Sequence, residues 1–455
     1  MTSDKVETII RMPTQREMIQ EKYSACDMAC RLNDHAHDLA KVGKINASVV
    51  ALRRAHALEP DHPIVLSCLG AVLFDSCEYV EAETHLRKSI SIEPEYAPAH
   101  GNLGTVLGAQ GKYDEAKASF RRAIEIEPDY SDARWNFSMC LLDSGDWASA
   151  WPFYEDRRER GGKKLYPAIP YPEWKGEDLN GKTLMVLGEQ GVGDRILASR
   201  YLHWVKEKFP GCKILFQNSA EDLPNVSNFF WGYRDIVEFI PNGIPWPKDV
   251  DYGIFLMRLM AVHGTTPENV YPEPGLLLKN AMRHKNSVTL PGVDDTMLKI
   301  GIAWTGNPQM KRNSERSVPL EEMLKLAELP NVVIYGLQIG TQDINRLGAD
   351  QLVCDLTHDI KSLGFAGTAA VMLNLDLVIT CCTATAHLAG ALGVPCWTLL
   401  CQNPYWMWLR DRSDSVWYPN TRLFRQKKMC DWSPVIDEVK SELALYSVQS
   451  ERKAA

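Results

Sequence analysis

The sequence predicts two regions of different fold class, an α-helical repeat solenoid followed by an α/β region with parallel sheets. Prolines recur at Pro60, Pro94 and Pro128, each 34 residues from the next, which is the period of a two-helix repeat. Beyond residue 182, short runs of Val, Ile and Leu alternate with helical stretches. Such runs are typical of parallel strands that are covered on both faces.

The repeats are clearest in residues 99–130. Gly104 and Ala116 are small where two antiparallel helices are expected to cross closely, and the preceding unit has Gly70 and Ala82 at the same offsets. Each proline ends the second helix of its unit. This is the pattern of the tetratricopeptide repeat. We expect residues 1–28 to be a lead-in and residues 29–160 to be the repeats, with a fourth, atypical copy from Ser131 as the cap.

Residues 161–181 are rich in Gly, Pro and Tyr, which predicts a linker. The apolar runs beyond it predict strands at Thr183–Gly188, Lys213–Gln217, Leu298–Trp304, Asn331–Leu337, Leu375–Thr380 and Pro395–Leu400. A proline-rich stretch between the second and third runs divides them into two Rossmann-like lobes, residues 182–290 and 291–455. A ligand is expected in the cleft between the lobes, at the carboxyl ends of the strands.

Composition and charge exclude several classes of protein. The formal net charge of −8 argues against a general affinity for nucleic acid. The chain has no apolar run of membrane-spanning length and no apolar signal-peptide core near its first residue. Cys26 and Cys30 are four apart and Cys381 and Cys382 are adjacent, but neither pair has a matching second pair, so no zinc site is expected. Reduced thiols in a cytoplasmic protein account for the twelve cysteines.

The first motif that could carry chemistry is GEQGVGD. Glu189 and Gln190 follow a strand that ends at Gly188, Gly191 and Gly193 allow a tight turn close to a ligand, and Asp194 lies at the start of a helix and projects toward the cleft. Asp194 is either a simple helix cap or a functional carboxylate, and the spacing alone favours the cap.

The second motif is a basic loop that follows the strand at residues 298–304. It contains Asn307, Lys311 and Arg316. A basic loop at the carboxyl end of a strand suits a phosphate group. A solvated loop accounts for the same composition equally well.

The third motif begins the helix that follows the strand at residues 375–380. Thr383, Ala384 and Thr385 open this helix, whose free N–H groups and dipole favour an anion without a metal. His387, in the first turn, could donate to a phosphate or a ribose. A lone histidine on an apolar helix is usually a core residue, but the strand–turn–helix position favours a functional one.

Together, EQGVGD, WTGNP with RSVPL, and LDLVIT–CTATAHLAGALG resemble bacterial tetratricopeptide proteins with a heptosyltransferase-like, family 9-type glycosyltransferase domain. The likeness extends from about Trp174 to Trp432. It implies the GT-B fold of two Rossmann lobes, with a nucleotide-sugar bound mainly to the C-terminal lobe. It also implies metal-independent catalysis with inversion.

By this resemblance Asp194 is the catalytic base and Arg316 contacts the donor's diphosphate, with Lys311 nearby. Thr383–Thr385 and His387 match the donor-binding loop, and Gln338 is a looser candidate for a nucleoside contact. Residues expected near the active site are Glu189, Gln190, Gly191, Gly193, Asn307 and Cys382.

Two positions depart from the family. Cys382 stands where an aspartate is usual, and Gly367 stands where an acid is common. Cysteine cannot accept hydrogen bonds as a carboxylate does. The departures leave room for a different donor or for lost activity.

The repeats also resemble those of protein O-GlcNAc transferases, in which an asparagine lines the groove and binds the backbone of a polypeptide. Asn102 and Asn136 share that repeat offset, whereas Cys68 and Asp34 occupy the other two copies. Ordinary polar residues on an inner helix are an equal alternative.

The sequence therefore predicts a cytoplasmic, metal-independent glycosyltransferase that acts on a protein or peptide acceptor recruited by the repeats. No cofactor is expected beyond the nucleotide-sugar substrate. Two alternatives remain, a non-catalytic scaffold with a degenerate glycosyltransferase domain and an enzyme that acts on a glycan or lipid-linked acceptor. Homo-oligomers are also left open, because short repeat arrays often pair.

Overall fold

The computed structural model describes residues 24–160, 163–218, 228–291, 296–310, 313–339, 343–357, 360 and 363–454. The chain divides into two compact units. The repeat unit contains Met1–Leu141 and Phe153–Tyr166, and the α/β unit contains Leu142–Pro152 and Pro167–Ala455.

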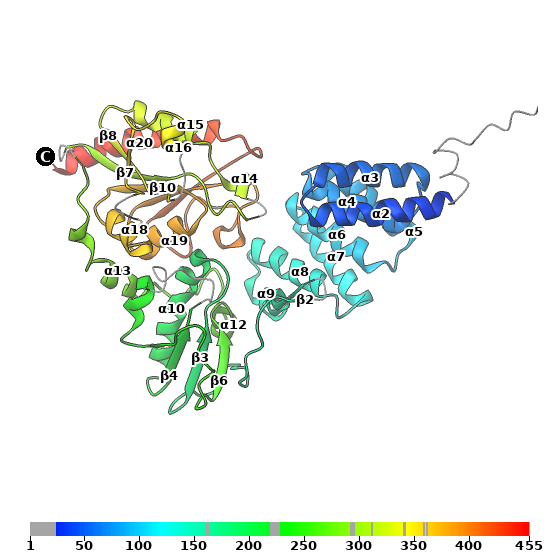
Figure 1. The fold of residues 1–455 in the computed structure, drawn as a ribbon, viewed down its shortest axis with the longest axis horizontal. Coiled ribbons are helices and arrows are strands. Elements are labelled where there is room, and N and C mark those ends of the chain that lie inside the picture. The colour runs from blue at the N-terminus through cyan, green and yellow to red at the C-terminus, as the bar shows by residue number, and fades with distance from the viewer. Residues whose placement is uncertain are drawn as a thin grey trace, which may run out of the picture. The chain divides into compact units, whose positions relative to one another are not determined.

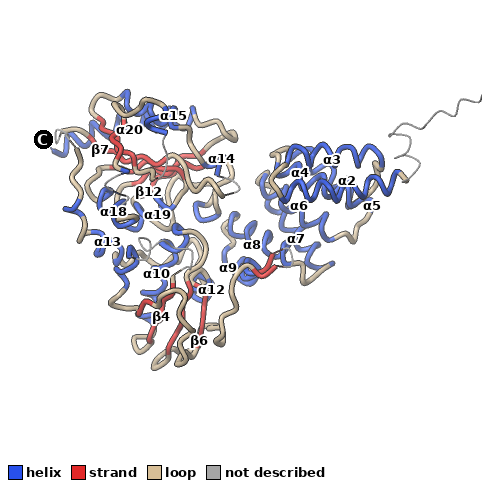
Figure 2. Tube along the Cα trace, viewed as in Figure 1, coloured by secondary structure: helices blue, strands red, loops and turns tan. Residues whose placement is uncertain are grey.

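The repeat unit is a stack of antiparallel helix pairs (Figures 1 and 2). Its helices are α2 (Ala25–Lys41), α3 (Ile45–Leu58), α4 (Pro63–Asp75), α5 (Tyr79–Ile92), α6 (Ala97–Ala109), α7 (Tyr113–Ile126) and α8 (Ser131–Asp143). Each pair packs within itself and against the next pair. Pro60, Pro94 and Pro128 lie between one pair and the next, so the predicted repeat is confirmed.

Glycines allow the two helices of a repeat to approach closely. A Cβ atom on Gly70 would lie 2.5 Å from Cγ of Leu86, and a Cβ on Gly104 would lie 2.9 Å from the ring of Phe120. These two contacts are one repeat apart. The close crossing predicted at Gly104 is therefore confirmed.

The first helix begins four residues before the expected start of the repeats. Ser24 and Asp27 form a capping box, in which the Asp27 N–H donates to Ser24 Oγ at 3.1 Å and the Ser24 N–H donates to Asp27 Oδ2 at 3.2 Å. Helix α2 therefore starts at Ala25, inside the stretch 1–28 that was expected to be a lead-in to the repeats. Residues 1–23 of the predicted lead-in lie outside the described residues.

The two units divide within the fourth repeat, not at the predicted boundary of residue 160. Helix α9 (Trp147–Tyr154) begins with a fully buried tryptophan that belongs to the α/β unit. The Trp147 ring stacks on the ring of Trp417, with centroids 5.3 Å apart. It also makes an edge-to-face contact with Trp406, with centroids 5.2 Å apart. The large apolar surface of these rings explains why Leu142–Pro152 packs with the α/β unit.

The end of the fourth repeat has little regular structure. A short 3₁₀ helix, η1 (Glu155–Arg158), follows α9. Strands β1 (Glu159–Arg160) and β2 (Lys163–Lys164) then form an antiparallel pair. Strand β2 lies inside the stretch that was predicted to be a linker.

The first lobe of the α/β unit is built on a parallel sheet with the order β5-β4-β3-β6. Its strands are β3 (Thr183–Leu187), β4 (Lys213–Gln217), β5 (Glu238–Phe239) and β6 (Tyr252–Phe255). Its helical segments are α10 (Val192–Lys208), η2 (Asn228–Tyr233), α12 (Arg258–His263), α13 (Leu276–Ala281) and η3 (Lys285–Ser287).

The second lobe has a parallel sheet with the order β12-β11-β10-β7-β8-β9. The strands are β7 (Leu298–Ala303), β8 (Val332–Gly336), β9 (Val353–Asp355), β10 (Leu377–Cys381), β11 (Cys396–Leu400) and β12 (Thr421–Arg425). The helical segments are α14 (Asn313–Arg316), α15 (Leu320–Met323), η4 (Leu324–Glu328), α16 (Asp343–Arg346), α18 (Phe365–Met372), α19 (Ala384–Ala391), η5 (Trp406–Trp408) and α20 (Ser433–Ala454).

Counted along the chain, this sheet has the doubly wound order of a Rossmann fold. Strands β7, β8 and β9 extend toward one edge, and β10, β11 and β12 extend toward the other. Buried residues of β7, β10 and β11 form the core with the inner face of α20. The predicted fold class, a tetratricopeptide-like helical stack followed by two Rossmann-like lobes, is confirmed, as are all the strands predicted from apolar runs.

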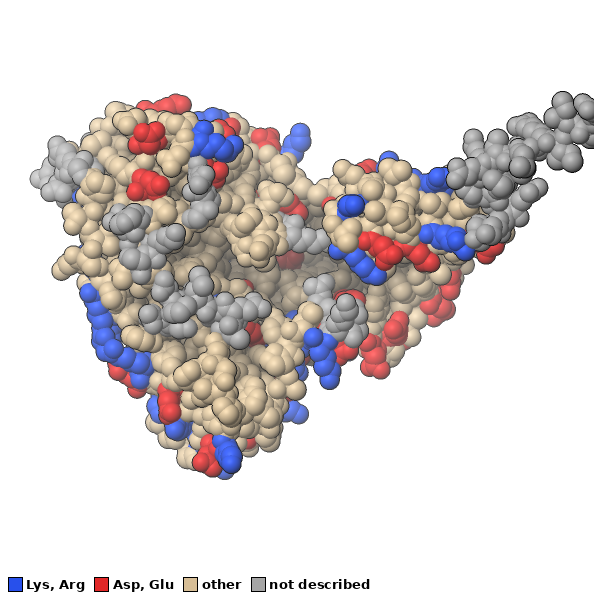
Figure 3. Space-filling model, viewed as in Figure 1, with Lys and Arg blue, Asp and Glu red and all other residues tan. Residues whose placement is uncertain are grey.

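Among the residues that the structure describes, every helix is too short or too polar to span a bilayer. On the face drawn in Figure 3, acidic and basic side chains are interspersed.

Candidate functional site

The second sheet reverses its strand order between β7 and β10. Ligands of doubly wound folds bind in the crevice beyond the carboxyl ends of the strands at such a switch point. The chain leaves β7 toward α14 and leaves β10 toward α19. The second and third sequence motifs therefore lie at one edge of one sheet.

Arg316 joins these two motifs. Its Nη1 donates to the carbonyl oxygen of Cys382 at 3.3 Å, and its Nε donates to Asn313 Oδ1 at 3.1 Å. Its guanidinium lies against Gly306, where any side chain would collide with it. The structure thus brings a fixed positive charge to the residue before Thr383.

The start of α19 has unused hydrogen-bonding capacity. Thr383 is the N-cap residue in an extended conformation, with φ of −140°, and its side chain makes no capping bond. Its Oγ1 is buried and has no hydrogen-bond partner among the described residues. A buried hydroxyl beside the free N–H groups of a helix start can accept or donate to an anionic ligand.

The first lobe has its own switch point, between β3 and β6. Glu189 follows β3 and is almost fully buried, and its Oε1 accepts a hydrogen bond from the Met257 N–H, beyond β6, at 3.1 Å. Gln190 has a φ of 60°, a left-handed conformation that is uncommon outside glycine. Glu189 therefore links the ends of β3 and β6. The strained turn at Gln190 sets the direction in which α10 begins.

Asp194 lies in the first turn of α10. Its Oδ2 accepts a hydrogen bond from the N–H of Gly191, the N-cap residue, at 3.0 Å. Burial raises the pKa of this carboxyl to about 6, against the lowering effect of the Gly191 hydrogen bond, and the charge of Glu189 raises it further. The capping role expected from the spacing is therefore present, and the pKa also suits a base that works near neutral pH.

The helix starts of the two lobes meet at Gly193. A Cβ on Gly193 would lie 2.8 Å from Cδ2 of His387 and 3.2 Å from Cα of Ala384. Glycine is therefore required where the first turn of α10 packs against the first turn of α19. This contact brings the first and third motifs together.

His387 is a buried, neutral side chain in this structure. Its Nδ1 forms a hydrogen bond with Tyr418 Oη at 3.1 Å, and its ring stacks on Trp408 with centroids 5.1 Å apart. Burial lowers the pKa of the imidazole to about 3, and the positive charge of Arg200 lowers it further. One ring nitrogen is therefore engaged within the protein.

Arg200 centres a buried cluster that sequence reasoning missed. It is fully buried and donates to the carbonyl oxygens of Tyr271 at 3.2 Å and Trp417 at 3.1 Å. Its Nη2 lies 3.5 Å from Glu273 Oε2, and burial raises the pKa of Glu273 to about 7. Because α10 belongs to the first lobe and Trp417 to the second, this cluster joins the lobes. The signal in the sequence was a lone arginine in the apolar run ILASRYL.

Cys382 is buried, and its Sγ accepts a hydrogen bond from Trp408 Nε1 at 3.0 Å. Burial raises the pKa of the thiol, so it stays protonated at neutral pH. Gly367 has no room for an acid, since a Cβ there would lie 2.9 Å from the carbonyl oxygen of Ile360. Both departures from the family pattern fit their surroundings.

The remaining residues predicted on the donor side of the site are Gln338, Asn307, Thr385 and Lys311. Gln338 Oε1 accepts from the Thr305 N–H at 3.1 Å, which links the ends of β8 and β7. Asn307 is exposed and accepts from the Gln309 N–H within its own loop. Thr385 is partly buried. Lys311 lies outside the described residues.

The two asparagines of the repeat unit bond to the preceding repeat. Asn102 Nδ2, on α6, donates to Ser67 Oγ at 3.2 Å, and Asn136 Nδ2, on α8, donates to Thr105 Oγ1 at 3.4 Å. Both side chains are partly buried. Their amides are thus positioned by neighbouring hydroxyls, and their role as an acceptor groove stays a prediction.

Comparisons with known proteins support the repeats most directly. Residues 97–130 match the Tetratricopeptide repeat family. Protein FlbA of Caulobacter vibrioides is 25% identical over 336 residues, which is 67% of this chain and 53% of FlbA. The chain therefore spans about half the length of this curated relative.

Solved structures that are similar to the chain include an enzyme and isolated tetratricopeptide domains. A mutant of Thermobaculum terrenum O-GlcNAc transferase is similar along 97% of this chain and 94% of its own, with 16% identity and a TM-score of 0.34. The tetratricopeptide domain of Arabidopsis OM64 covers 26% of this chain and 96% of its own, with 21% identity and a TM-score of 0.25. The first such domain of Spaghetti (RPAP3), bound to an HSP90 peptide, covers 25% and 91%, with 20% identity and a TM-score of 0.24. Scores this low support no conclusion about activity.

Proposed function

We propose that this protein is a glycosyltransferase that moves a sugar from a nucleotide-sugar to a protein or peptide acceptor recruited by the repeats. The observation that carries the proposal is the meeting of three features at the switch points of two Rossmann-like lobes. These features are the guanidinium of Arg316, the buried Thr383 hydroxyl at the start of α19, and the first turn of α10, which contains Asp194.

The donor's diphosphate is proposed to bind at the carboxyl edge of β7 and β10. Arg316 lies 3.3 Å from the Cys382 carbonyl, one residue before the helix start that also offers the Thr383 hydroxyl. A guanidinium and a helix N-terminus both stabilise the negative charge that develops on a leaving diphosphate. These groups supply that stabilisation from the protein itself, so the proposal requires no metal ion.

Asp194 is proposed to accept the proton of the acceptor hydroxyl. With a pKa of about 6, its carboxylate is mostly ionised at neutral pH yet basic enough to take a proton. Transfer then passes through an oxocarbenium-like state. Inversion at the sugar carbon rests on the resemblance to the heptosyltransferases alone.

The repeats are proposed to hold the acceptor. Asn102 and Asn136 occupy the same offset in successive repeats, and each amide is held by a hydroxyl of the preceding repeat. A regular series of fixed amides can bond the backbone of an extended peptide.

The first test measures donor binding by the full chain. Titration calorimetry with a panel of nucleotide-sugars and nucleoside diphosphates, in EDTA, is expected to show saturable binding. Arg316→Ala is expected to weaken binding about tenfold or more, since charge-assisted hydrogen bonds contribute about 1.5–3 kcal/mol. Arg346→Ala is the matched control, because Arg346 is an exposed arginine of α16 that pairs with Asp343.

Equal binding by the native chain and Arg316→Ala would refute the diphosphate contact. Sugar transfer to a peptide that is lost in a chain without the repeats would support recruitment of a protein acceptor. Transfer to glycan or lipid-linked acceptors that is independent of the repeats would favour the alternative enzyme, which acts on such acceptors instead of proteins.

A second candidate function is a non-catalytic scaffold. The observation that favours it is the contact of Gly193 with Ala384, which brings a neighbouring helix against the start of α19. Cys382 also replaces the family's aspartate with a protonated thiol bonded to Trp408. A chain that binds none of the donors would support the scaffold and leave the repeats as the functional part.

A further inference from the structure

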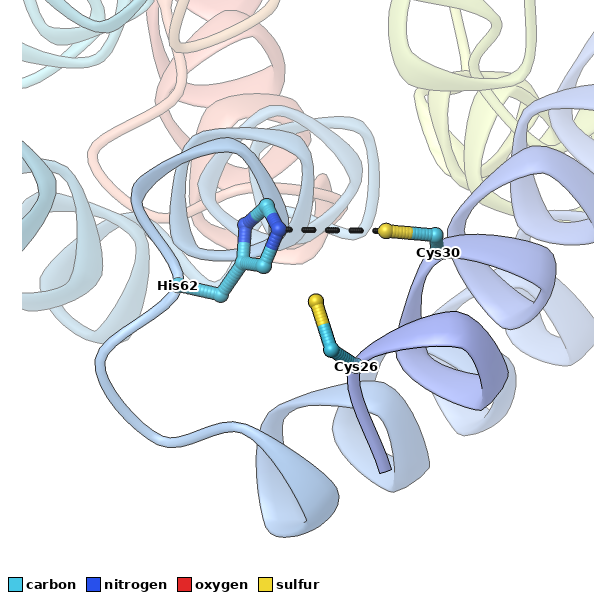
Figure 4. Close-up of side chains that lie close together, drawn as sticks. All are labelled: Cys26, Cys30 and His62. Carbon is cyan, nitrogen blue, oxygen red and sulfur yellow. Dashed lines mark hydrogen bonds between the residues drawn. The ribbon is translucent and has the colours of Figure 1, made fainter. Parts of the chain in front are cut away.

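Two cysteines and a histidine converge at the beginning of the repeat unit. Figure 4 shows the sulfur atoms of Cys26 and Cys30 and the ring of His62 directed toward the same space. Cys30 Sγ lies 3.8 Å from His62 Nε2, and the potential ligand atoms of all three residues lie within 4.8 Å of one another. Among the described residues, this is the one group of acidic, cysteine and histidine side chains close enough to share a metal ion.

The fold brings these residues together from separate elements. Cys26 and Cys30 are one helical turn apart, so they lie on the same face of α2. His62 is the residue before α4, which begins at Pro63 and packs against α2. Because His62 is 32 residues from Cys30, no short cysteine spacing could indicate it, and the sequence predicted no zinc site.

The distances suit a tetrahedral ion. Zn–S bonds of about 2.3 Å and Zn–N bonds of about 2.0–2.1 Å place neighbouring ligand atoms about 3.5–3.8 Å apart. The distance of 3.8 Å between Cys30 Sγ and His62 Nε2 is only slightly longer than the sulfur–nitrogen separation of about 3.5–3.6 Å that these bond lengths give. Both cysteines are exposed, so their side chains can rotate to close the remaining separations.

Neither a disulfide nor a capping histidine accounts for the cluster. Cβ atoms one turn apart on a helix are about 5–6 Å from each other, whereas a disulfide needs about 3.5–4.5 Å, so this pair cannot be oxidised without unwinding α2. His62 also does not cap α4 with its side chain, and its buried Nδ1 has no hydrogen-bond partner among the described residues. The hydrogen bond printed for this imidazole is the one between Nε2 and Cys30 Sγ, so its partner is itself a proposed metal ligand.

We propose that Cys26, Cys30 and His62 bind a Zn²⁺ ion, with a water molecule at the fourth position. Thiolate and imidazole are the ligands that Zn²⁺ prefers in proteins. The ion ties the first turn of α2 to the start of α4, across the first repeat. It stabilises the beginning of the array and takes no part in sugar transfer, so it does not depend on the proposed function.

Cobalt titration of the full reduced chain tests the site. Co²⁺ added to metal-free protein is expected to give thiolate-to-metal charge-transfer absorption and the intense visible bands of a tetrahedral ion, with one equivalent at saturation. Zn²⁺ is expected to displace it. Both signals should be lost in Cys26→Ser, Cys30→Ser and His62→Ala. Cys77→Ser and His37→Ala are the matched controls, because both residues are exposed, lie in the repeat unit and are outside the cluster.

A second readout is the melting temperature of the chain, because a ligand that binds the folded state raises it. Zn²⁺ should raise the melting temperature of the native chain and of both controls, but not that of Cys26→Ser. Absence of the cobalt bands in the native chain would overturn the proposal. Bands that persist in Cys26→Ser and Cys30→Ser would overturn it as well, because they would assign the metal to other residues.

Discussion

Burial gives three neighbouring side chains different charges at neutral pH. The pKa of Asp194 is raised to about 6, so its carboxyl is mostly ionised, whereas the pKa of His387 is lowered to about 3, so its ring is neutral. The pKa of Cys382 is raised, so its thiol is protonated. Asp194 is therefore the anionic group among them, and perturbed pKa values of this kind are typical of functional sites.

Asp194→Asn is expected to lower turnover far more than donor binding, because the amide cannot accept the acceptor's proton. In the native chain, turnover should rise as the pH increases through about 6, where the carboxylate forms. The raised pKa also means that ionisation opposes folding, so the stability contributed by this group is present below the unfolded pKa and lost as the pH rises through 6.

Turnover against pH and donor affinity, measured for both chains, check this role. Asp437→Asn on α20 is the control, since Asp437 is an exposed aspartate far along the chain from the site. An Asp194→Asn variant in which turnover and donor affinity fall equally would contradict the assignment of Asp194 as base.

The helix pairs of the repeat unit owe their spacing to single glycines. Gly104→Ala should destabilise the chain by about 1–3 kcal/mol, because overpacking a close contact strains both elements. The new Cβ would lie 2.9 Å from three atoms of the Phe120 ring. The melting transition of the repeat unit, followed by calorimetry, measures the effect.

Gly108→Ala is the control on the same helix, α6. A Cβ at Gly108 would meet only Cys140 Sγ at 3.9 Å, an ordinary contact. Alanine is the better helix former by about 1 kcal/mol, so this variant should be neutral or more stable. Equal melting temperatures for Gly104→Ala and Gly108→Ala would show that the close helix crossing at Gly104 does not require glycine.

Elements with strong apolar runs were predictable, and shorter or more polar ones were not. Strands β7 and β10 are almost entirely buried, and their apolar runs identified them. Strands β5 and β9 have only two and three residues, too few to show a period. Strand β12 contains Arg422 and Arg425, and charged residues concealed it although it pairs with β11.

For the whole molecule, Trp147 decides where one unit ends and the other begins. Trp147→Ala should destabilise the α/β unit by about 3–5 kcal/mol, because a buried tryptophan is removed and a cavity is left between Trp406 and Trp417. Calorimetry should show the transition of the α/β unit at a lower temperature in this variant. That transition is identified as the one that Gly104→Ala, in the repeat unit, leaves unchanged.

Trp231→Ala is the matched control, since Trp231 belongs to the same unit and is 49% exposed. It should shift that transition little. A chain that begins at residue 142 should likewise retain the stability of the α/β unit, whereas one that begins at residue 163 should lose it. Equal stability of the two truncated chains would argue against the boundary within the fourth repeat.

The sequence by itself determined the repeat, the two lobes and the strands that carry the motifs, because these follow from local periodicity. It also indicated Asp194 and Arg316 as residues at the ends of strands. Only the tertiary structure decided which strand ends share a switch point, how Gly193 meets Ala384, and that Arg200 joins the lobes. It alone also placed His62 beside Cys26 and Cys30. Contacts between residues far apart in the chain depend on packing, which no local pattern records.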